Sequence, residues 1–146
     1  MRCDELGGRV VQVALGNNGV GGELLPFFGR LGALLALRLQ SNPALRGDVA
    51  DLAGATELRD LSLQNCPLVV GEAAALAALV HLGEDCSVCH FGDPGTGGLH
   101  LAGSGVHGPV AALRALPGLG ADWGSDYFTP GSAFGGQQAS QSLIHI

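Results

Sequence analysis

A short cysteine-containing stretch is the first place where residue types and spacing could do chemistry. Residues 86–90 read CSVCH, the C-x-x-C-H attachment sequence of a c-type haem. Cys86, Cys89 and His90 could instead supply three ligands of a zinc ion, although the chain has no second ligand pair at a matching spacing. A disulfide between the two cysteines, or two free thiols, requires no cofactor. We expect no cofactor and keep zinc, with haem behind it, as alternatives.

A second stretch has the spacing of a phosphate-binding turn. Residues 103–108 read GSGVHG, the G-x-G-x-x-G pattern in which a backbone turn approaches the pyrophosphate of a dinucleotide. Such a site needs buried parallel strands before and after its first helix. The strand before these glycines spans only residues 99–102, and the segment where the second strand should lie reads GADWGSD. The glycine spacing alone does not support a dinucleotide site.

The other polar residues show no catalytic constellation. His100 has no nucleophile or carboxylate in its local sequence, so we expect a contact residue rather than a general base. The acidic residues Asp48, Asp51, Glu57 and Asp60 lack the spacing of a glycosidase acid pair and are expected on a solvated face. We therefore expect a protein that is not an enzyme.

Composition limits the class of protein. The chain has 146 residues, of which 47% are hydrophobic and 14% charged, which suits one domain with a core of small side chains. The formal net charge of -6 leaves no basic stripe for a nucleic acid. We find no apolar run long enough for a transmembrane segment and no signal peptide. As written, the chain is expected to be intracellular unless it is a fragment of a secreted or receptor protein.

The elements that position these residues follow from an internal repeat. From Val10 the chain fits the pattern V-x-x-V-x-L-x-x-N-x-V-x-G-x-L, and two later copies fit it with one additional residue after the asparagine slot. Val13, Leu37 and Leu61 fill one slot at two equal intervals of 24 residues. Leu99 fills it again 38 residues later, which is one unit of 24 and 14 more. An insertion or a degenerate repeat is therefore expected at residues 83–97.

These slots resemble the leucine-rich repeat family, and the form N-x-L-x-G-x-L resembles its plant-type subclass. Upstream, Cys3 lies shortly before the step Gly8-Arg9-Val10, which resembles the end of that subclass's N-terminal cap. The resemblance implies an α/β-type repeat solenoid. Its form would be a short horseshoe, with a parallel β-sheet on the concave face and short helical or irregular segments on the convex face.

The repeat also predicts how the chain is divided. Trp123, Tyr127 and Phe128 are expected to cover the open end of the stack, because terminal repeats expose apolar faces. The expected parts are a remnant of the N-terminal cap (1–9), three repeats (10–82), the insertion or degenerate repeat (83–97), a fourth repeat (98–120), a closing segment (121–130) and a low-complexity, disordered tail (131–146).

The asparagine slot is expected to turn the chain out of each strand and to bond backbone groups of adjacent turns in a buried ladder. Cys66 in this slot should be a buried structural residue rather than a reactive thiol. The ladder residues are Asn18, Asn42, Cys66 and Ser104, of which the last two can make fewer bonds. Glycines expected at turns with positive φ or no room for a side chain are Gly22, Gly47, Gly71 and Gly108.

The concave face should expose alternate strand residues, because successive side chains of a strand point to opposite faces. Its polar residues are Gln12, Arg38, Gln40, Asp60, Ser62, Gln64 and His100. A rigid face of mixed polar groups suits recognition of a protein or peptide, and the family resemblance implies the same. We expect a non-enzymatic binding module, whole or as a fragment of a receptor-like or inhibitor-like protein. The alternative is a zinc- or haem-binding protein that uses Cys86, Cys89 and His90.

Overall fold

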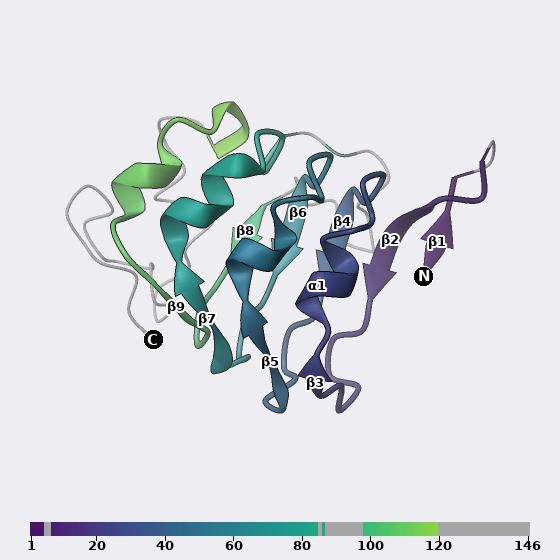
Figure 1. Cartoon of the computed structure of the whole chain (residues 1–146), viewed down its shortest axis with the longest axis horizontal. Coiled ribbons are helices and arrows are strands. Elements are labelled where there is room, and N and C mark those ends of the chain that lie inside the picture. Colours follow the sequence, from purple (N-terminus) through teal and green to yellow (C-terminus); the bar gives the residue numbers. More distant parts are fainter. Residues whose placement is uncertain (5–6, 85, 87–97, 120–146) are drawn as a thin grey trace.

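The computed structural model describes residues 1–4, 7–84, 86 and 98–119, which form an α/β fold with two mainly parallel sheets and few helices (Figure 1). Sheet A has the order β1-β2-β4-β6-β8, and sheet B has the order β3-β5-β7-β9. Sheet A contains β1 (Arg2–Cys3), β2 (Val10–Ala14), β4 (Ala36–Arg38), β6 (Asp60–Ser62) and β8 (Leu99–His100). Sheet B contains β3 (Gly22–Glu23), β5 (Leu45–Asp48), β7 (Leu68–Glu72) and β9 (Gly105–His107). Every strand pair is parallel except β1–β2.

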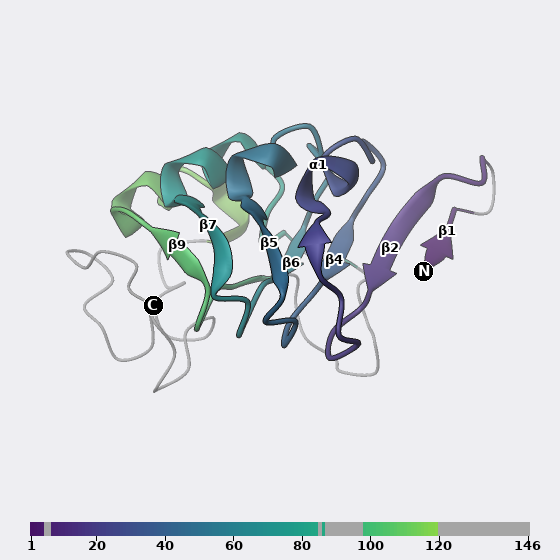
Figure 2. The ribbon, with the colours of Figure 1, turned by 60° about the horizontal axis from the view of Figure 1, so that its bottom comes forward.

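Short helical turns follow the strands of sheet B and form a further layer, seen along the top of the molecule in Figure 2. Each has room for only one or two turns, because the chain must return to sheet A within the same unit. The Asp48 carboxylate caps the first 3₁₀-helix by accepting a hydrogen bond of 2.8 Å from Ala50 N. The helices are α1 (Leu25–Phe28) and the 3₁₀-helices η1 (Val49–Leu52), η2 (Ala73–Ala78), η3 (Val110–Leu113) and η4 (Pro117–Leu119).

The strands of sheet A pair in the register that the sequence spacing predicts. Val13 lies opposite Leu37, Leu37 opposite Leu61, and Leu61 opposite Leu99. The predicted equivalence of these four positions is therefore confirmed, including the last pair, which the extra 14 residues separate in sequence. These side chains and those of Leu39, Leu63 and Leu101 in the following slot are buried in the core, and Leu15 is partly buried against it. Stacking one unit on the next is what removes them from water.

The turns that leave sheet A repeat as closely as the strands do. Asn17, Ser41 and Asn65 have φ values of 55°, 59° and 55°, and Gly103 takes the equivalent place with φ of 72°. Asparagine and glycine tolerate this left-handed region best. All four glycines for which a special conformation was predicted also have positive φ. At one of them, Gly71, an added Cβ would in addition collide with the Asp48 carboxylate of the preceding unit.

Sheet B is a feature that sequence analysis missed. Strand β7 alternates between exposed and buried residues, with Val69 and Gly71 inward and Leu68, Val70 and Glu72 outward. The apolar residue and glycine of each repeat unit were assigned to a turn or an irregular segment. In the structure their backbones pair in parallel from unit to unit. This alternation is one of burial and not of residue type, because the outward residues Leu68 and Val70 are apolar, so the sequence carried no alternation of apolar and polar residues there.

The asparagine slot works as predicted at Asn42, which is fully buried. Asn42 Oδ1 accepts from Asn18 N (3.3 Å) and Val20 N (2.9 Å) of the preceding unit. Its amide nitrogen donates to Leu15 O (2.9 Å) and Leu39 O (2.8 Å). One side chain thus satisfies backbone groups of two adjacent turns.

The other ladder positions show why the slot is selective. Cys66 is buried and donates to Leu39 O at 3.1 Å, and burial raises the pKa of its thiol, so its predicted structural place is confirmed. Ser104 is buried, and its hydroxyl accepts from Val106 N of its own turn at 3.4 Å. The prediction of a buried ladder residue is wrong for Asn18, which is exposed and donates to Gly16 O at 2.8 Å. No earlier parallel unit stacks on its turn within the described residues.

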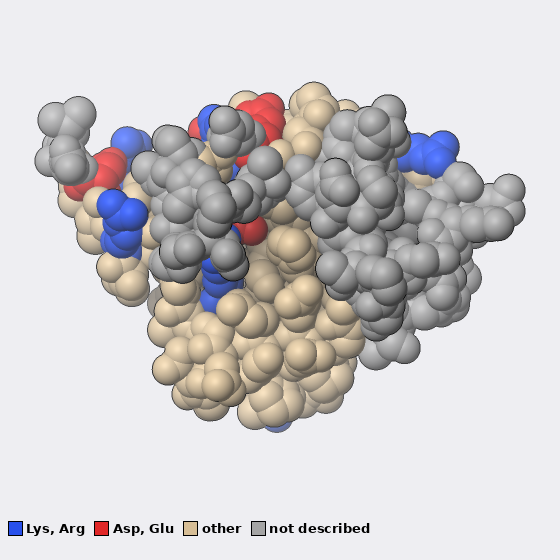
Figure 3. Space-filling model, turned by 180° about the vertical axis from the view of Figure 1, so that it is seen from behind, with Lys and Arg blue, Asp and Glu red and all other residues tan. Residues whose placement is uncertain are grey.

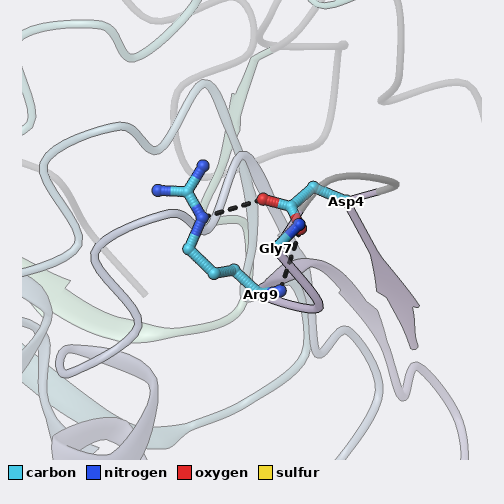
Figure 4. A network of polar contacts seen from close by, with 3 residues as sticks. All are labelled: Asp4, Gly7 and Arg9. Carbon is cyan, nitrogen blue, oxygen red and sulfur yellow. Dashed lines mark hydrogen bonds and ion pairs between the residues drawn. The ribbon is translucent and has the colours of Figure 1, made fainter.

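The chain begins with an antiparallel hairpin rather than a repeat strand. β1 pairs with β2, and the loop between them is held by Asp4 (Figure 4). One carboxylate oxygen accepts from Gly7 N (2.9 Å) and Arg9 N (3.0 Å), and the other accepts from Arg9 Nε at 2.8 Å. The hairpin occupies the outer edge of β2, which would otherwise present unpaired backbone groups. The predicted closing segment (121–130) and tail (131–146) lie outside the described residues.

Replacing Asn42 by alanine should lower the free energy of unfolding by about 3 kcal/mol, because several buried backbone groups lose their partners at once. The matched control is Asn18→Ala, which removes an exposed bond within one turn and should cost less than about 1 kcal/mol. Urea unfolding measures both. Equal losses in the two variants would contradict the ladder role of Asn42.

Asp4 provides a prediction about pH. Hydrogen bonds from the side chain and backbone of Arg9 hold the pKa of the Asp4 carboxyl below its ordinary value of 3.8. Because the folded-state pKa is lowered, the Asp4 carboxylate stabilises the loop fully above pH 3.8. This stabilisation is lost as the pH falls through the folded-state pKa. The Arg9 amide resonance should therefore titrate with a midpoint below 3.8 and lose that titration in Asp4→Asn. A midpoint at or above 3.8 would show that the loop contacts do not persist in solution.

Candidate functional site

The outer face of sheet A carries the residues for which sequence analysis predicted a contact role. Strand pairing arranges them in rows that run across the strands. The first row is Gln12, Ala36 and Asp60, and the second row is Ala14, Arg38, Ser62 and His100. The third row is Gly16, Gln40, Gln64 and Ala102. Three backbone hydrogen bonds hold this row in line: Asn17 N donates to Gln40 O (2.8 Å), Ser41 N to Gln64 O (2.7 Å) and Asn65 N to Ala102 O (2.8 Å).

The first row is buried, which corrects the prediction that it is exposed. Gln12 is 1% exposed, Ala36 0% and Asp60 1%. Asp60 therefore does not lie on a solvated face either. Strand alternation places these side chains on the side opposite the core, but it does not show what covers that side. Among the described residues, Cys86 packs against Ala36.

An ion pair joins the first row to the second. Arg38 Nε lies 2.6 Å from Asp60 Oδ2, and the Arg38 side chain is 22% exposed while that of Asp60 is 1% exposed. A buried carboxylate is tolerated where a guanidinium donates to it directly. The pair fixes the direction of the Arg38 side chain and leaves part of it at the surface.

His100 extends the same cluster onto β8. It lies opposite Ser62 and is partly buried, while Ser62 itself is buried, contrary to its predicted exposure. Burial lowers the pKa of the His100 imidazole below its ordinary value of 6.5. The Asp60 carboxylate opposes this shift and the Arg38 guanidinium adds to it. The imidazole is therefore mainly neutral at pH 7, when one ring nitrogen can donate and the other accept.

The third row presents carboxamide groups at the end of the strands. Gln40 and Gln64 are both partly exposed. The Gln40 carboxamide lies over Gly16, where an added Cβ would come within 2.5 Å of Gln40 Cδ. The absence of a side chain at Gly16 thus gives Gln40 its place. Gln40 Oε1 is buried, so the acceptor of this carboxamide does not lie at the surface.

The cysteine motif is only partly within the described residues. Cys86 is disulfide-bonded and 3% exposed, so in this state it offers no thiolate to a metal ion and is neither a free thiol nor a surface residue. Cys89 and His90 lie outside the described residues. Within residues 1–4, 7–84, 86 and 98–119, no group of three or more histidine, cysteine or acidic residues is placed to hold a metal ion.

Three further polar contacts were not predicted. Glu84 Oε2 lies 3.0 Å from His81 Nδ1 and 3.6 Å from Arg59 Nη1, at the start of the segment where the repeat pattern fails. His107 Nδ1 lies 3.2 Å from Glu72 Oε1 across sheet B, with both side chains mostly exposed. No sequence spacing would have paired Arg59 with Glu84, because their proximity depends on how the chain folds back.

In the view from behind, the charged side chains of the described residues lie mostly across the upper half of the molecule, and few are visible in the lower half (Figure 3). No helix within the described part of the chain is both long and apolar enough to cross a membrane. No family model matches the chain, and no curated protein matches it either.

The His100 environment can be tested by titration. The imidazole should titrate below 6.5 in the folded protein, with a higher pKa in Arg38→Gln and a lower one in Asp60→Asn, because the first change removes a repelling charge and the second an attracting one. The ring proton resonances of His100 measure all three values.

The same shift predicts how stability depends on pH. On acidification, His100 takes up a proton at a higher pH in the unfolded chain than in the folded one. Its contribution to stability is therefore complete above pH 6.5 and declines as the pH falls below that value. Urea unfolding at a series of pH values should show this decline and should show less of it in His100→Gln. In the titration described above, a shift of the His100 pKa in the same direction in Arg38→Gln and in Asp60→Asn would contradict the arrangement of these three side chains.

Proposed function

We propose that this chain is a leucine-rich repeat solenoid of the plant type and a non-enzymatic module that binds a protein or peptide on the outer face of sheet A. The observation that carries the binding proposal is the juxtaposition of Arg38, Gln40, Gln64 and His100. They come from three successive parallel strands or the turns that follow them, and all are partly exposed.

The repeat part of the proposal is supported by features that recur from unit to unit. Strand register, the left-handed turn after each strand of sheet A and the bonds of Asn42 follow the spacing of 24, 24 and 38 residues. A stack of this kind presents a rigid face, because each unit is fixed by backbone bonds to its neighbours. Rigidity reduces the conformational entropy that is lost on binding.

The kind of partner follows from the groups presented. Arg38 is held by Asp60, so its charge is largely balanced, and the surrounding groups are carboxamides and an imidazole. Neutral donors and acceptors at intervals of one strand suit the backbone of an extended peptide segment. A partner selected mainly by strong negative charge fits this balanced face less well.

The test is selection of binding peptides from a random displayed library on the folded protein, followed by affinity measurements on variants. Gln64→Ala and Arg38→Ala should each weaken binding about tenfold, the effect of losing one central contact. Arg46→Ala is the matched control, because Arg46 is an exposed arginine in β5 of sheet B.

Thermal unfolding must accompany the Arg38 measurement, because Arg38→Ala leaves the buried Asp60 carboxylate without its guanidinium. Gln64→Ala leaves that pair intact and is the cleaner variant. Peptides whose affinity is unchanged in both variants, or reduced equally by Arg46→Ala, would show that the outer face of sheet A is the wrong surface.

A further inference from the structure

The turn that leaves β2 contains an asparagine followed directly by a glycine. Asn18 and Gly19 are both exposed, and Gly19 has a φ of 65° with open space where a side chain would lie. Within the described residues, the Asn18 carboxamide makes one hydrogen bond, from Nδ2 to Gly16 O at 2.8 Å. The carboxamide is therefore held at the surface by a bond within its own turn.

The backbone nitrogen of Gly19 is the group that could react with this carboxamide. It donates no hydrogen bond within the described residues. The backbone nitrogens on either side of it, Asn18 N and Val20 N, are both engaged, because each donates to the side chain of Asn42. Glycine has no Cβ to hinder the approach of its nitrogen to a neighbouring group. The turn thus places an unbonded nitrogen beside an exposed carboxamide, on a residue type that is chemically labile.

The other asparagines of the chain lack this combination. Asn42 is buried, and the proline that follows it has no N–H. Asn17 is followed by Asn18, whose nitrogen is hydrogen-bonded. Asn65 is followed by Cys66, which carries a side chain and is buried. Among the asparagines, Asn18 alone precedes a glycine.

We propose that Asn18 is a modification site, where loss of the side-chain amide yields isoaspartate and releases the first repeat unit from Asn42. Gly19 N attacks Asn18 Cγ: a new carbon–nitrogen bond forms, the Cγ–Nδ2 bond breaks, and the Gly19 proton leaves with the side-chain nitrogen as ammonia. Water then opens the cyclic imide. Opening at the main-chain carbonyl gives isoaspartate, and opening at the former side-chain carbonyl gives aspartate. Water is the only co-reactant, and nothing is oxidised or reduced.

Isoaspartate changes the backbone itself, because the chain then runs through the former side chain and gains one carbon atom. That atom lies between Asn18 N and Val20 N, which donate to the same acceptor, Asn42 Oδ1, at 3.3 and 2.9 Å. The lengthened turn can no longer present both donors in this geometry. Asn42 is fully buried, so a lost partner weakens the contact between the first two units. Aspartate adds the same charge at this exposed place but keeps the backbone length.

The first measurement locates the conversion. Full-length protein is held at mildly alkaline pH, and its peptides are analysed by mass spectrometry, which resolves the replacement of NH₂ by OH. A protein isoaspartyl methyltransferase with a labelled methyl donor distinguishes isoaspartate from aspartate. We expect conversion and label at Asn18, an unchanged carboxamide at Asn42 and Asn65, and no label in Asn18→Ala. An Asn18 that keeps its carboxamide in the folded protein, while the urea-unfolded chain converts, would overturn the proposal, because the fold would then block the attack.

The second measurement follows the contact between the first two units by amide hydrogen exchange. The Val20 amide should be protected in the unmodified protein and should lose that protection in the isoaspartyl form. Asn18→Asp is the matched control, because it has the same charge on a normal backbone, and it should keep Val20 protected. Leu39 N donates to Ser62 O at 2.8 Å between the second and third units and should stay protected throughout.

Three outcomes of the exchange experiment would overturn the release of the first unit. Protection of Val20 in the isoaspartyl form would show that the lengthened turn still reaches Asn42. Equal loss of that protection in Asn18→Asp would assign the effect to charge. Loss of protection at Leu39 together with Val20 would show that the modification unfolds the stack instead of freeing one unit.

Discussion

Backbone hydrogen bonding between the parallel strands of sheet A is the constraint on which the rest of the structure depends. Because Val13, Leu37, Leu61 and Leu99 are placed in one line by this pairing, their side chains stack and the core follows. A shift of one residue in any strand would turn its leucine outward and its polar residue into the core. Asn42 protects the register where the strands end, since it bonds the backbone of two turns.

The same register creates the candidate surface on the opposite side. Asp60 and Arg38 lie in adjacent rows on adjacent strands, close enough for a direct ion pair, and His100 is near enough to respond to both charges. The burial of Asp60 makes the pair necessary, since a carboxylate removed from water requires a donor. The ion pair with Asp60 therefore also orients the Arg38 side chain, part of which stays at the surface.

The departure from the repeat after Leu82 brings a later part of the chain onto this face. The chain turns at Gly83 toward Arg59 and places Cys86, which is disulfide-bonded, on Ala36.

The sequence by itself determined the units, the equivalence of Val13, Leu37, Leu61 and Leu99, the positive φ of four glycines and the buried place of Cys66. These properties follow from spacing and residue type, because a stacked unit requires apolar and turn residues at fixed positions. Only the tertiary structure decided that Gln12, Asp60 and Ser62 are buried, that Asn18 is exposed, and that a second parallel sheet forms. Periodicity assigns a side chain to a face, whereas its exposure depends on distant chain segments packed on that face. Arg38–Asp60 and Cys86–Ala36 are contacts of this second kind, joining residues whose separation in sequence carries no signal of their proximity.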